Sequence, residues 1–183
     1  MLDKHLVAHC SPTLAGLKSA NIFNYSFKSI KLLEQQLELL RADLRPKGVS
    51  LRVLRRSGKR ALIYVYRSAR VQEELQRQGV LDFLSNYGYE TDRLEVCLQY
   101  LSVRISSHLE FPHEIGLFLG YPLDDVKGFI ENKGRNSRCC GCWKVYCNEC
   151  EAQKLFDRFE KCRAIYWNLF NRGKSVVQLT VAA

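Results

Sequence analysis

The residues most suggestive of chemistry lie near the start of the chain, where His9 and Cys10 precede Ser11 and Pro12. Serine is a frequent helix cap, and proline is favoured at the first position of a helix. This pattern predicts a short helix that runs from Ser11 to about Phe23 and places Cys10 beside its positive end, where a thiolate is stabilised. Lys18 follows further along the same helix and is a candidate binding residue. The alternative is that Cys10 is a small buried packing residue, since free cysteines are often buried.

A second pair of residues, His113 and Glu114, follows Pro112 at the start of another predicted helix. Imidazole and carboxylate groups can act as general bases or as metal ligands. A cysteine beside a histidine supports nucleophilic or redox chemistry. The leading hypothesis is therefore a catalytic group formed by the convergence of Cys10, His9, His113 and Glu114.

The chain has eight cysteines, and six of them lie between Cys139 and Cys162. In a reducing compartment such residues are thiols or metal ligands rather than disulfides. The candidate ligands for zinc or iron are Cys140, Cys142, Cys147 and Cys150. A strand over 143–147 would place thiols on opposite faces, so a four-thiolate site would need a bulge or a tight reversal there.

Positive charge is concentrated in one part of the chain. Residues 41–70 hold ten basic residues and one acid, a surplus of nine that equals the whole net charge of +9. Around a predicted hairpin turn at 57–60 stand five candidate binding residues, Arg52, Arg55, Arg56, Lys59 and Arg60. Together with Lys144, they suggest a phosphate-bearing ligand or an acidic redox protein such as a flavodoxin-like partner. The alternative is charge that protects the edge of a sheet.

The segment from Glu114 to Phe129 has the glycine and apolar spacing of a helix-turn-helix. Its second helix would expose Asp124, Asp125 and Glu131, with only Lys127 positive. Phosphate and base-edge contacts need basic or amide side chains. Sequence-specific DNA binding is therefore not expected, and two short packed helices are the favoured interpretation.

Periodicity predicts the elements that must position these residues. Leucines at three- and four-residue steps indicate a helix over 30–44, and β-rich runs indicate strands over 49–56 and 61–67, the second buried on both faces. Further helices are expected over 69–87, 92–107, 112–120 and up to 132, a long one from 149 to Gly173, and a last strand over 177–181. The expected fold is an α/β domain of the α+β type, with a small, partly antiparallel sheet.

Composition bounds the class of protein. The 183 residues are 46% hydrophobic and 26% charged, values typical of one globular domain spanning 1–183. No apolar run reaches the ~20 residues that a membrane span needs, and the first ten residues lack an apolar signal-peptide core. We therefore expect a cytoplasmic protein without a membrane partner.

Four segments together resemble one bacterial family. They read HCSPTLAGLK at 9–18, RALIYVYR at 60–67, FPHEIGLFLGYP at 111–122 with GFIEN at 128–132, and CWKVY at 142–146. They are similar to the family named domain of unknown function 3793, and the similarity covers nearly the whole chain. The resemblance implies no particular reaction, but it associates the chain with anaerobic bacteria, flavodoxins and iron handling, and hence with redox or metal biology.

One departure from the family pattern bears on the metal hypothesis. A Gly-Asp-like turn is expected after the Lys-Val-Tyr motif, but this chain has Cys147-Asn148-Glu149-Cys150. A metal site using Cys147 and Cys150 would then be peculiar to this member. The leading function is a thiol- or metal-linked, redox-associated module. The alternatives are a non-enzymatic binding module that uses the basic hairpin, and a helix-turn-helix regulator.

Overall fold

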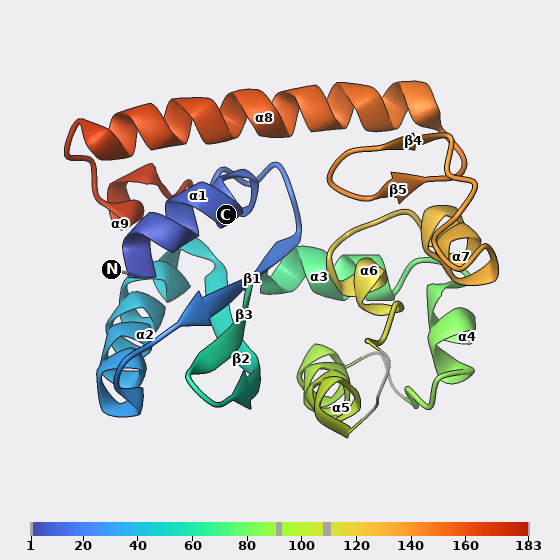
Figure 1. Cartoon of the computed structure of the whole chain (residues 1–183), viewed down its shortest axis with the longest axis horizontal. Helices are drawn as coiled ribbons and strands as arrows, with labels where there is room; N and C mark the ends of the chain where they lie inside the picture. Colours follow the sequence, from blue (N-terminus) through green and yellow to red (C-terminus); the bar gives the residue numbers. More distant parts are fainter. Residues whose placement is uncertain (1, 91–92, 108–110, 183) are drawn as a thin grey trace.

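A three-stranded antiparallel sheet lies at the centre of the fold. The computed structural model describes residues 2–90, 93–107 and 111–182. The sheet has the order β1–β3–β2, built from β1 (Ala20–Ser26), β2 (Val49–Ser57) and β3 (Arg60–Arg67). Helices cover it on both sides, and a small two-stranded ribbon lies apart from it (Figure 1). The expected α+β class is confirmed.

The central strand β3 is buried on both faces, as its continuous apolar sequence predicts. Because side chains alternate along a strand, Ile63 and Val65 point into one hydrophobic cluster, whereas Tyr64 and Tyr66 point into another. The first cluster is covered by α1 (Leu2–Leu14), α2 (Ile30–Leu44) and α9 (Val176–Leu179). The second is covered by α3 (Ser68–Leu75), α4 (Val80–Ser85), α5 (Leu94–Ser107) and α6 (Ile115–Phe118).

The leucine stripe of α2 forms as expected. Leu33, Leu37, Leu40 and Leu44 are buried, and the Ser29 side chain accepts a hydrogen bond from the backbone of Leu32 at the start of the helix. A 3-10 turn, η1 (Arg45–Lys47), then leads into β2. The helix expected over 69–87 is instead two helices, because Gly79 adopts a left-handed φ of 79° between α3 and α4.

The C-terminal part of the chain builds a second layer. Helix α7 (Leu123–Glu131) leads to the ribbon of β4 (Cys139–Cys140) and β5 (Lys144–Val145), so the strand expected over 143–147 is only two residues long. Helix α8 (Glu149–Asn171) then runs across the whole molecule, over the ribbon at one end and over α1 at the other (Figure 1). No helix among the described residues is long and apolar enough to cross a membrane.

Two expected elements are wrong. The helix predicted from Ser11 to about Phe23 begins at Leu2 and ends at Leu14. The residues expected to complete it form strand β1 from Ala20 onward. Leu2, Leu6, Cys10 and Leu14 recur every four residues and are all buried, and this packing carries the helix through Pro12. The last strand is instead the short helix α9, because Ser175 and Gln178 form a capping box that starts a helix there.

The turn between α6 and α7 depends on a glycine in close contact. A Cβ at Gly116 would lie 2.7 Å from the Val126 side chain and 3.1 Å from that of Tyr121. We predict that Gly116→Ala lowers the free energy of unfolding by about 1–3 kcal/mol, since extra volume in a packed core forces displacement. Urea denaturation measures this. Unchanged stability in Gly116→Ala would contradict close packing at Gly116.

Candidate functional site

A cavity of about 360 Å³ lies between the α6–α7 corner and the β4–β5 ribbon. Two of the family-like segments, 111–122 and 142–146, meet in its walls, and β1 contributes one residue. We call it the ribbon cavity. Its walls are mainly apolar and aromatic: Ile22, Phe111, His113, Ile115, Gly116, Leu119, Tyr121, Asp125, Val126, Phe129, Cys140, Gly141, Cys142, Trp143 and Lys144. Small-molecule sites commonly have this concave, apolar character.

Aromatic side chains set the shape of the ribbon cavity. The rings of Tyr121 and Trp143 are stacked with their centroids 4.8 Å apart. Phe156 of α8 packs against Trp143 in an edge-to-face arrangement, with the ring centroids 4.6 Å apart. On another wall, the rings of His113 and Phe129 are in contact, with their centroids 4.8 Å apart. Because ring pairs at these distances are mutually supported, the walls are preformed rather than created by a ligand.

Asp125 holds the ribbon onto α7. Its carboxylate accepts hydrogen bonds from the Trp143 indole (2.8 Å), from the backbone amides of Tyr146 (2.7 Å) and Cys147 (3.1 Å), and from the Cys147 thiol (3.0 Å). Burial would raise the pKa of Asp125, but these donors outweigh it and leave the pKa below its usual value. Asp125 is 2% exposed, so the expectation that it faces solvent is wrong, whereas Asp124 is exposed as expected.

A thiol in the cavity wall lies among cationic groups. The guanidinium nitrogens of Arg163, on α8, lie 3.7 and 3.9 Å from Cys142 Sγ. The Tyr121 hydroxyl donates to the Cys142 carbonyl at 3.2 Å. Lys18 lies over the Tyr121 ring, with Nζ 5.0 Å from the ring centroid. Residues from segments far apart in sequence therefore meet around Cys142, and the guanidinium of Arg163 lies beside its sulfur.

Lys18 is a buried amine, 6% exposed, whose Nζ donates to the Ala20 carbonyl. Burial lowers its pKa to about 8; the neighbouring thiols of Cys142 and Cys10 raise the pKa, and the charge of Arg163 lowers it. No ion pair to Lys18 occurs within the described ranges. Lys18 was expected to be a binding residue, and it lies directly behind the cavity wall.

Cys10 is not at a helix N-terminus. It lies in the last part of α1, fully buried in the hydrophobic cluster beneath that helix. Burial raises the pKa of its thiol well above the usual value, and the nearby charge of Lys18 opposes this only partly. The predicted low-pKa thiolate is therefore wrong, and the alternative of a buried packing residue describes Cys10.

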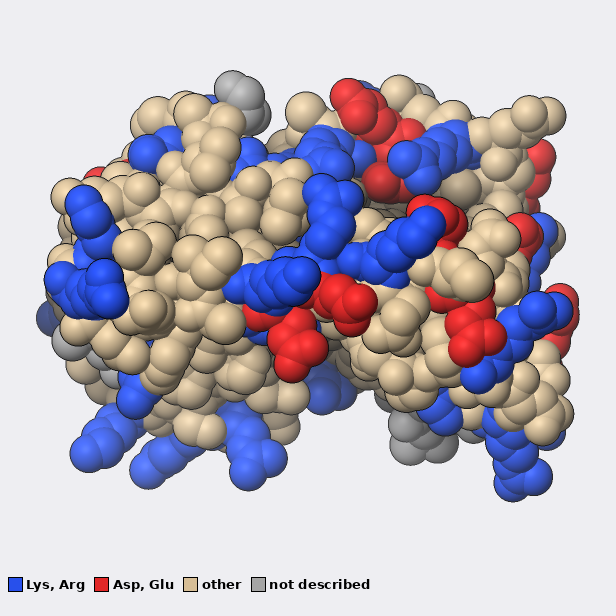
Figure 2. Space-filling view, turned by 90° about the horizontal axis from the view of Figure 1, so that it is seen from above, with Lys and Arg blue, Asp and Glu red and all other residues tan. Residues whose placement is uncertain are grey.

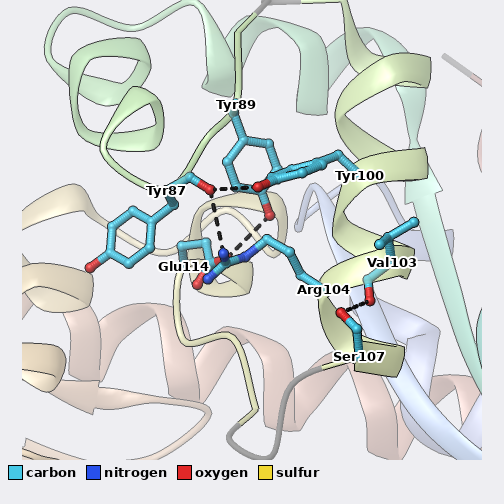
Figure 3. Close-up of polar contacts among 7 residues, drawn as sticks. All are labelled: Tyr87, Tyr89, Tyr100, Val103, Arg104, Ser107 and Glu114. Atoms are coloured by element: carbon cyan, nitrogen blue, oxygen red, sulfur yellow. Dashed lines mark hydrogen bonds and ion pairs between the residues drawn. The ribbon is translucent and has the colours of Figure 1, made fainter.

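Glu114 is committed to a buried ion pair (Figure 3). It is 1% exposed, pairs with Arg104 and accepts a hydrogen bond from the Tyr89 hydroxyl at 3.3 Å. Arg104 also donates to the Tyr87 carbonyl, which the Tyr100 hydroxyl shares at 3.0 Å. This network joins the start of α6 to α5 and to the segment that precedes α5. Glu114 is therefore a structural residue of the fold.

The two histidines proposed as catalytic residues, His9 and His113, lie in different surroundings. His113 is exposed at the ribbon cavity. His9 is exposed on α1, stacked on Phe23 at 5.5 Å and on His5 at 5.9 Å. Burial and the charges of His5 and Arg163 lower the pKa of His9. Since Cys10 is enclosed and Glu114 is paired elsewhere, the predicted convergence of these four residues is not found.

The four predicted metal-binding cysteines have separate surroundings. Cys147 donates to Asp125, Cys142 lies beside Arg163, and Cys140 and Cys150 are exposed. Burial and the bond to Asp125 raise the pKa of Cys147. Across the described part of the chain, no three side chains of His, Cys, Asp or Glu are grouped as metal ligands. The ribbon brings Cys140 and Cys142, but not Cys147, to the cavity.

The basic hairpin forms as predicted, but several of its charges are engaged. Arg52 pairs with Glu95, Arg56 pairs with Glu34 at 3.0 Å, and Arg55 donates to the Ile105 carbonyl at 3.3 Å. Lys59 and Arg60 are exposed at the turn. Of the other binding candidates, Lys144 lines the ribbon cavity and donates to the Gly134 carbonyl. On the face seen from the α8 side, acidic side chains lie beside many basic ones (Figure 2).

Sequence reasoning missed Arg163 and the roles of Tyr121 and Phe129. Arg163 lies on a long helix with other charged residues, and no local pattern singles it out. Tyr121 and Phe129, in contrast, fall within the segments that carry the family resemblance. Their aromatic character next to glycines, Gly120 of the turn and Gly128 of α7, was an available signal for a cavity wall.

Comparison with known proteins gives a family but no activity. No curated protein matches the chain, and no solved structure matches it either. The family described as protein of unknown function (DUF3793) matches residues 6–180, which include every element that lines the ribbon cavity. The chain therefore belongs to the DUF3793 family.

Proposed function

We propose that this protein is a thiol-linked ligand-binding module, and that the ribbon cavity takes a compact, largely apolar molecule with a planar ring. The observation that carries the proposal is the Cys142 thiol in a wall of stacked aromatic rings, 3.7 Å from a guanidinium. The volume of about 360 Å³ suits a small molecule rather than a chain segment.

The chemistry of the walls supports an aromatic ligand. Trp143, Tyr121 and Phe129 offer ring faces and edges, and planar rings bind such surfaces with favourable offset or edge contacts. Most polar groups in the walls are already engaged, because Asp125 is saturated by the ribbon and Lys144 donates to a carbonyl. The thiols of Cys142 and Cys140 and the imidazole of His113 therefore supply the available chemistry.

Arg163 gives Cys142 its particular role. A guanidinium beside a sulfur can donate to it and stabilise negative charge that develops when the thiol reacts. Cys142 is partly exposed, whereas Cys10 is closed off. The thiol-linked hypothesis therefore applies to Cys142, supported by Arg163 and Lys18, and no longer to Cys10.

Two thiol reagents of different shape test this proposal. N-phenylmaleimide carries an apolar ring, and iodoacetamide does not. We expect the ratio of the two modification rates to be about tenfold higher at Cys142 than at Cys150, an exposed thiol at the start of α8 that does not line the cavity. A tenfold ratio corresponds to about 1.4 kcal/mol of extra binding, within reach of one buried ring. Mass spectrometry of the native protein gives the rate at each cysteine.

Two further observations decide the outcome. Arg163→Met should slow modification of Cys142 by both reagents, while the rate at Cys150 stays as it is. Cys10 should react only after unfolding, because it is fully buried. Equal reagent ratios at Cys142 and Cys150 would contradict a ring-binding cavity.

A further inference from the structure

A second hollow, of about 720 Å³, lies where β2 begins, β3 ends and α3 starts. It lies at the opposite end of β2 and β3 from the hairpin turn. Three guanidinium groups line it, those of Arg45, Arg67 and Arg70, and no carboxylate of a described side chain is among the lining groups. We call it the arginine hollow. None of the three arginines forms an ion pair within residues 2–90, 93–107 and 111–182.

Arg67 is a buried part of this hollow, with 4% of its surface exposed. Its Nε donates to the Thr13 carbonyl at 2.8 Å, and its Nη2 donates to the carbonyls of Leu14 and Val181, both at 2.8 Å. Its Nη1 has no hydrogen bond to the described residues. Every buried side-chain nitrogen in that part of the chain has a hydrogen-bond partner. Because Nη1 has none, it is not fully buried, and it is open to the hollow that Arg67 lines. The backbone bonds hold the guanidinium rigidly, and two donors stay free.

The surroundings of Arg67 add further donors and positive charge. Arg70 donates to the Gly16 carbonyl and lies close enough to lower the pKa of Arg67, after the larger effect of burial. The hydroxyls of Ser50 and Ser68 lie 3.1 Å apart in the same hollow. The first turn of α3 has no capping side chain, so its backbone amides also point toward this end. Among the described residues, the hollow is therefore lined by like charges and hydrogen-bond donors, and by no carboxylate.

We propose that the arginine hollow binds the phosphate group of a small phosphate ester. Guanidinium groups match the oxygens of a phosphate with paired hydrogen bonds, and Arg67, held by three backbone carbonyls, loses little entropy when it binds. The serine hydroxyls and helix amides suit the same oxygens. This site is independent of the ribbon cavity, and it places anion recognition at the opposite end of the strands from the predicted hairpin.

Inorganic phosphate is the first probe, and adenosine monophosphate is the second. The parent protein should bind phosphate, measured by calorimetry, and its Tm should rise with phosphate but not with chloride at equal ionic strength. The double variant Arg45→Gln, Arg70→Gln should bind phosphate at least tenfold more weakly. Arg67 is left intact because its side chain holds three carbonyls. Tighter binding of the monophosphate than of phosphate would identify an ester with an organic part as the ligand, and equal binding would identify the free ion.

The matched control removes the same charge elsewhere. Lys59→Gln with Arg60→Gln takes two exposed charges from the hairpin turn, and phosphate binding should stay within twofold of the parent. Equal loss in both double variants would show diffuse attraction and overturn the site, as would a parent protein that phosphate does not stabilise.

Discussion

Asp125→Ala is expected to lower the free energy of unfolding by about 3 kcal/mol. The substitution removes the acceptor of four hydrogen bonds, from the Trp143 indole, the Tyr146 amide, and the amide and thiol of Cys147. A buried donor without its partner costs about 1–3 kcal/mol, and these donors are partly rather than fully buried. Urea denaturation at neutral pH measures the change.

Asp124→Ala is the matched control. Asp124 precedes Asp125 in the first turn of α7, carries the same charge and is exposed. Its removal loses only a favourable interaction with the helix dipole, worth about 0.3–1 kcal/mol. A loss of stability in Asp125→Ala no greater than in Asp124→Ala would show that Asp125 does not hold the ribbon.

The acid side of the stability profile gives a second measurement. Because the pKa of Asp125 is lowered by folding, its contribution is complete above the usual aspartate value and is lost as pH falls through the folded value. The parent should therefore lose more stability in acid than Asp125→Ala does. The stabilities of the two proteins should approach each other as pH falls from the usual aspartate value to the folded pKa, with no further change below it.

Strands β2 and β3 and helix α2 were predictable because their patterns are strong, whereas most of β1 was assigned to a helix. Continuous apolar residues from Ala61 to Tyr66 require cover on both faces, and that strand is central. The three- and four-residue leucine spacing of α2 identified its buried side. In both cases periodicity and burial depend on the same physical requirement, the removal of apolar side chains from water.

The errors arose where a local signal competed with packing. Ser11-Pro12 has the form of a helix start, but the four-residue repeat that includes Cys10 extends α1 across it. The buried face of a helix is decided by its tertiary neighbours, and α1 is packed between β1 and α8. Because α1 begins at Leu2 rather than at Ser11, Cys10 lies in the core and not at a helix N-terminus. The chemistry predicted for Cys10 depended on that helix N-terminus.

The candidate site was only partly predictable for a related reason. His113, Cys140, Cys142 and Lys144 were singled out from the sequence, and all of them line the ribbon cavity. Their partners were not, because Arg163 reaches Cys142 only through the path of α8. The acid at position 125 was read by charge alone as solvent-facing, yet its charge is satisfied internally by the ribbon.

Lys18→Met is expected to change how stability depends on pH. The folded protein lowers the pKa of Lys18 from 10.5 to about 8, chiefly through burial. Between these values the unfolded chain binds a proton that the folded chain does not, so the parent gains stability as pH rises from about 8 toward 10.5. Below pH 8 both states are protonated, and the parent carries the full cost of a buried ammonium, about 3 kcal/mol.

The measured quantity is the stability of the parent minus that of Lys18→Met, from urea denaturation at pH 7, 8, 9 and 10. This difference should move in favour of the parent by roughly 2–3 kcal/mol across the series. Subtraction removes the other groups whose protonation changes in the same window, provided that they behave alike in both proteins. Methionine fills a similar volume and keeps the contact with the Tyr121 ring.

Lys4→Met is the control for this experiment. Lys4 also lies over an aromatic ring, 5.5 Å from the centroid of Trp167, but it is exposed. Its replacement should shift stability by the same small amount at every pH. A flat difference for Lys18→Met as well would mean that the Lys18 ammonium is solvated in the folded protein. In that case Lys18 would not be a buried amine poised to change its charge near pH 8 behind the Cys142 thiol.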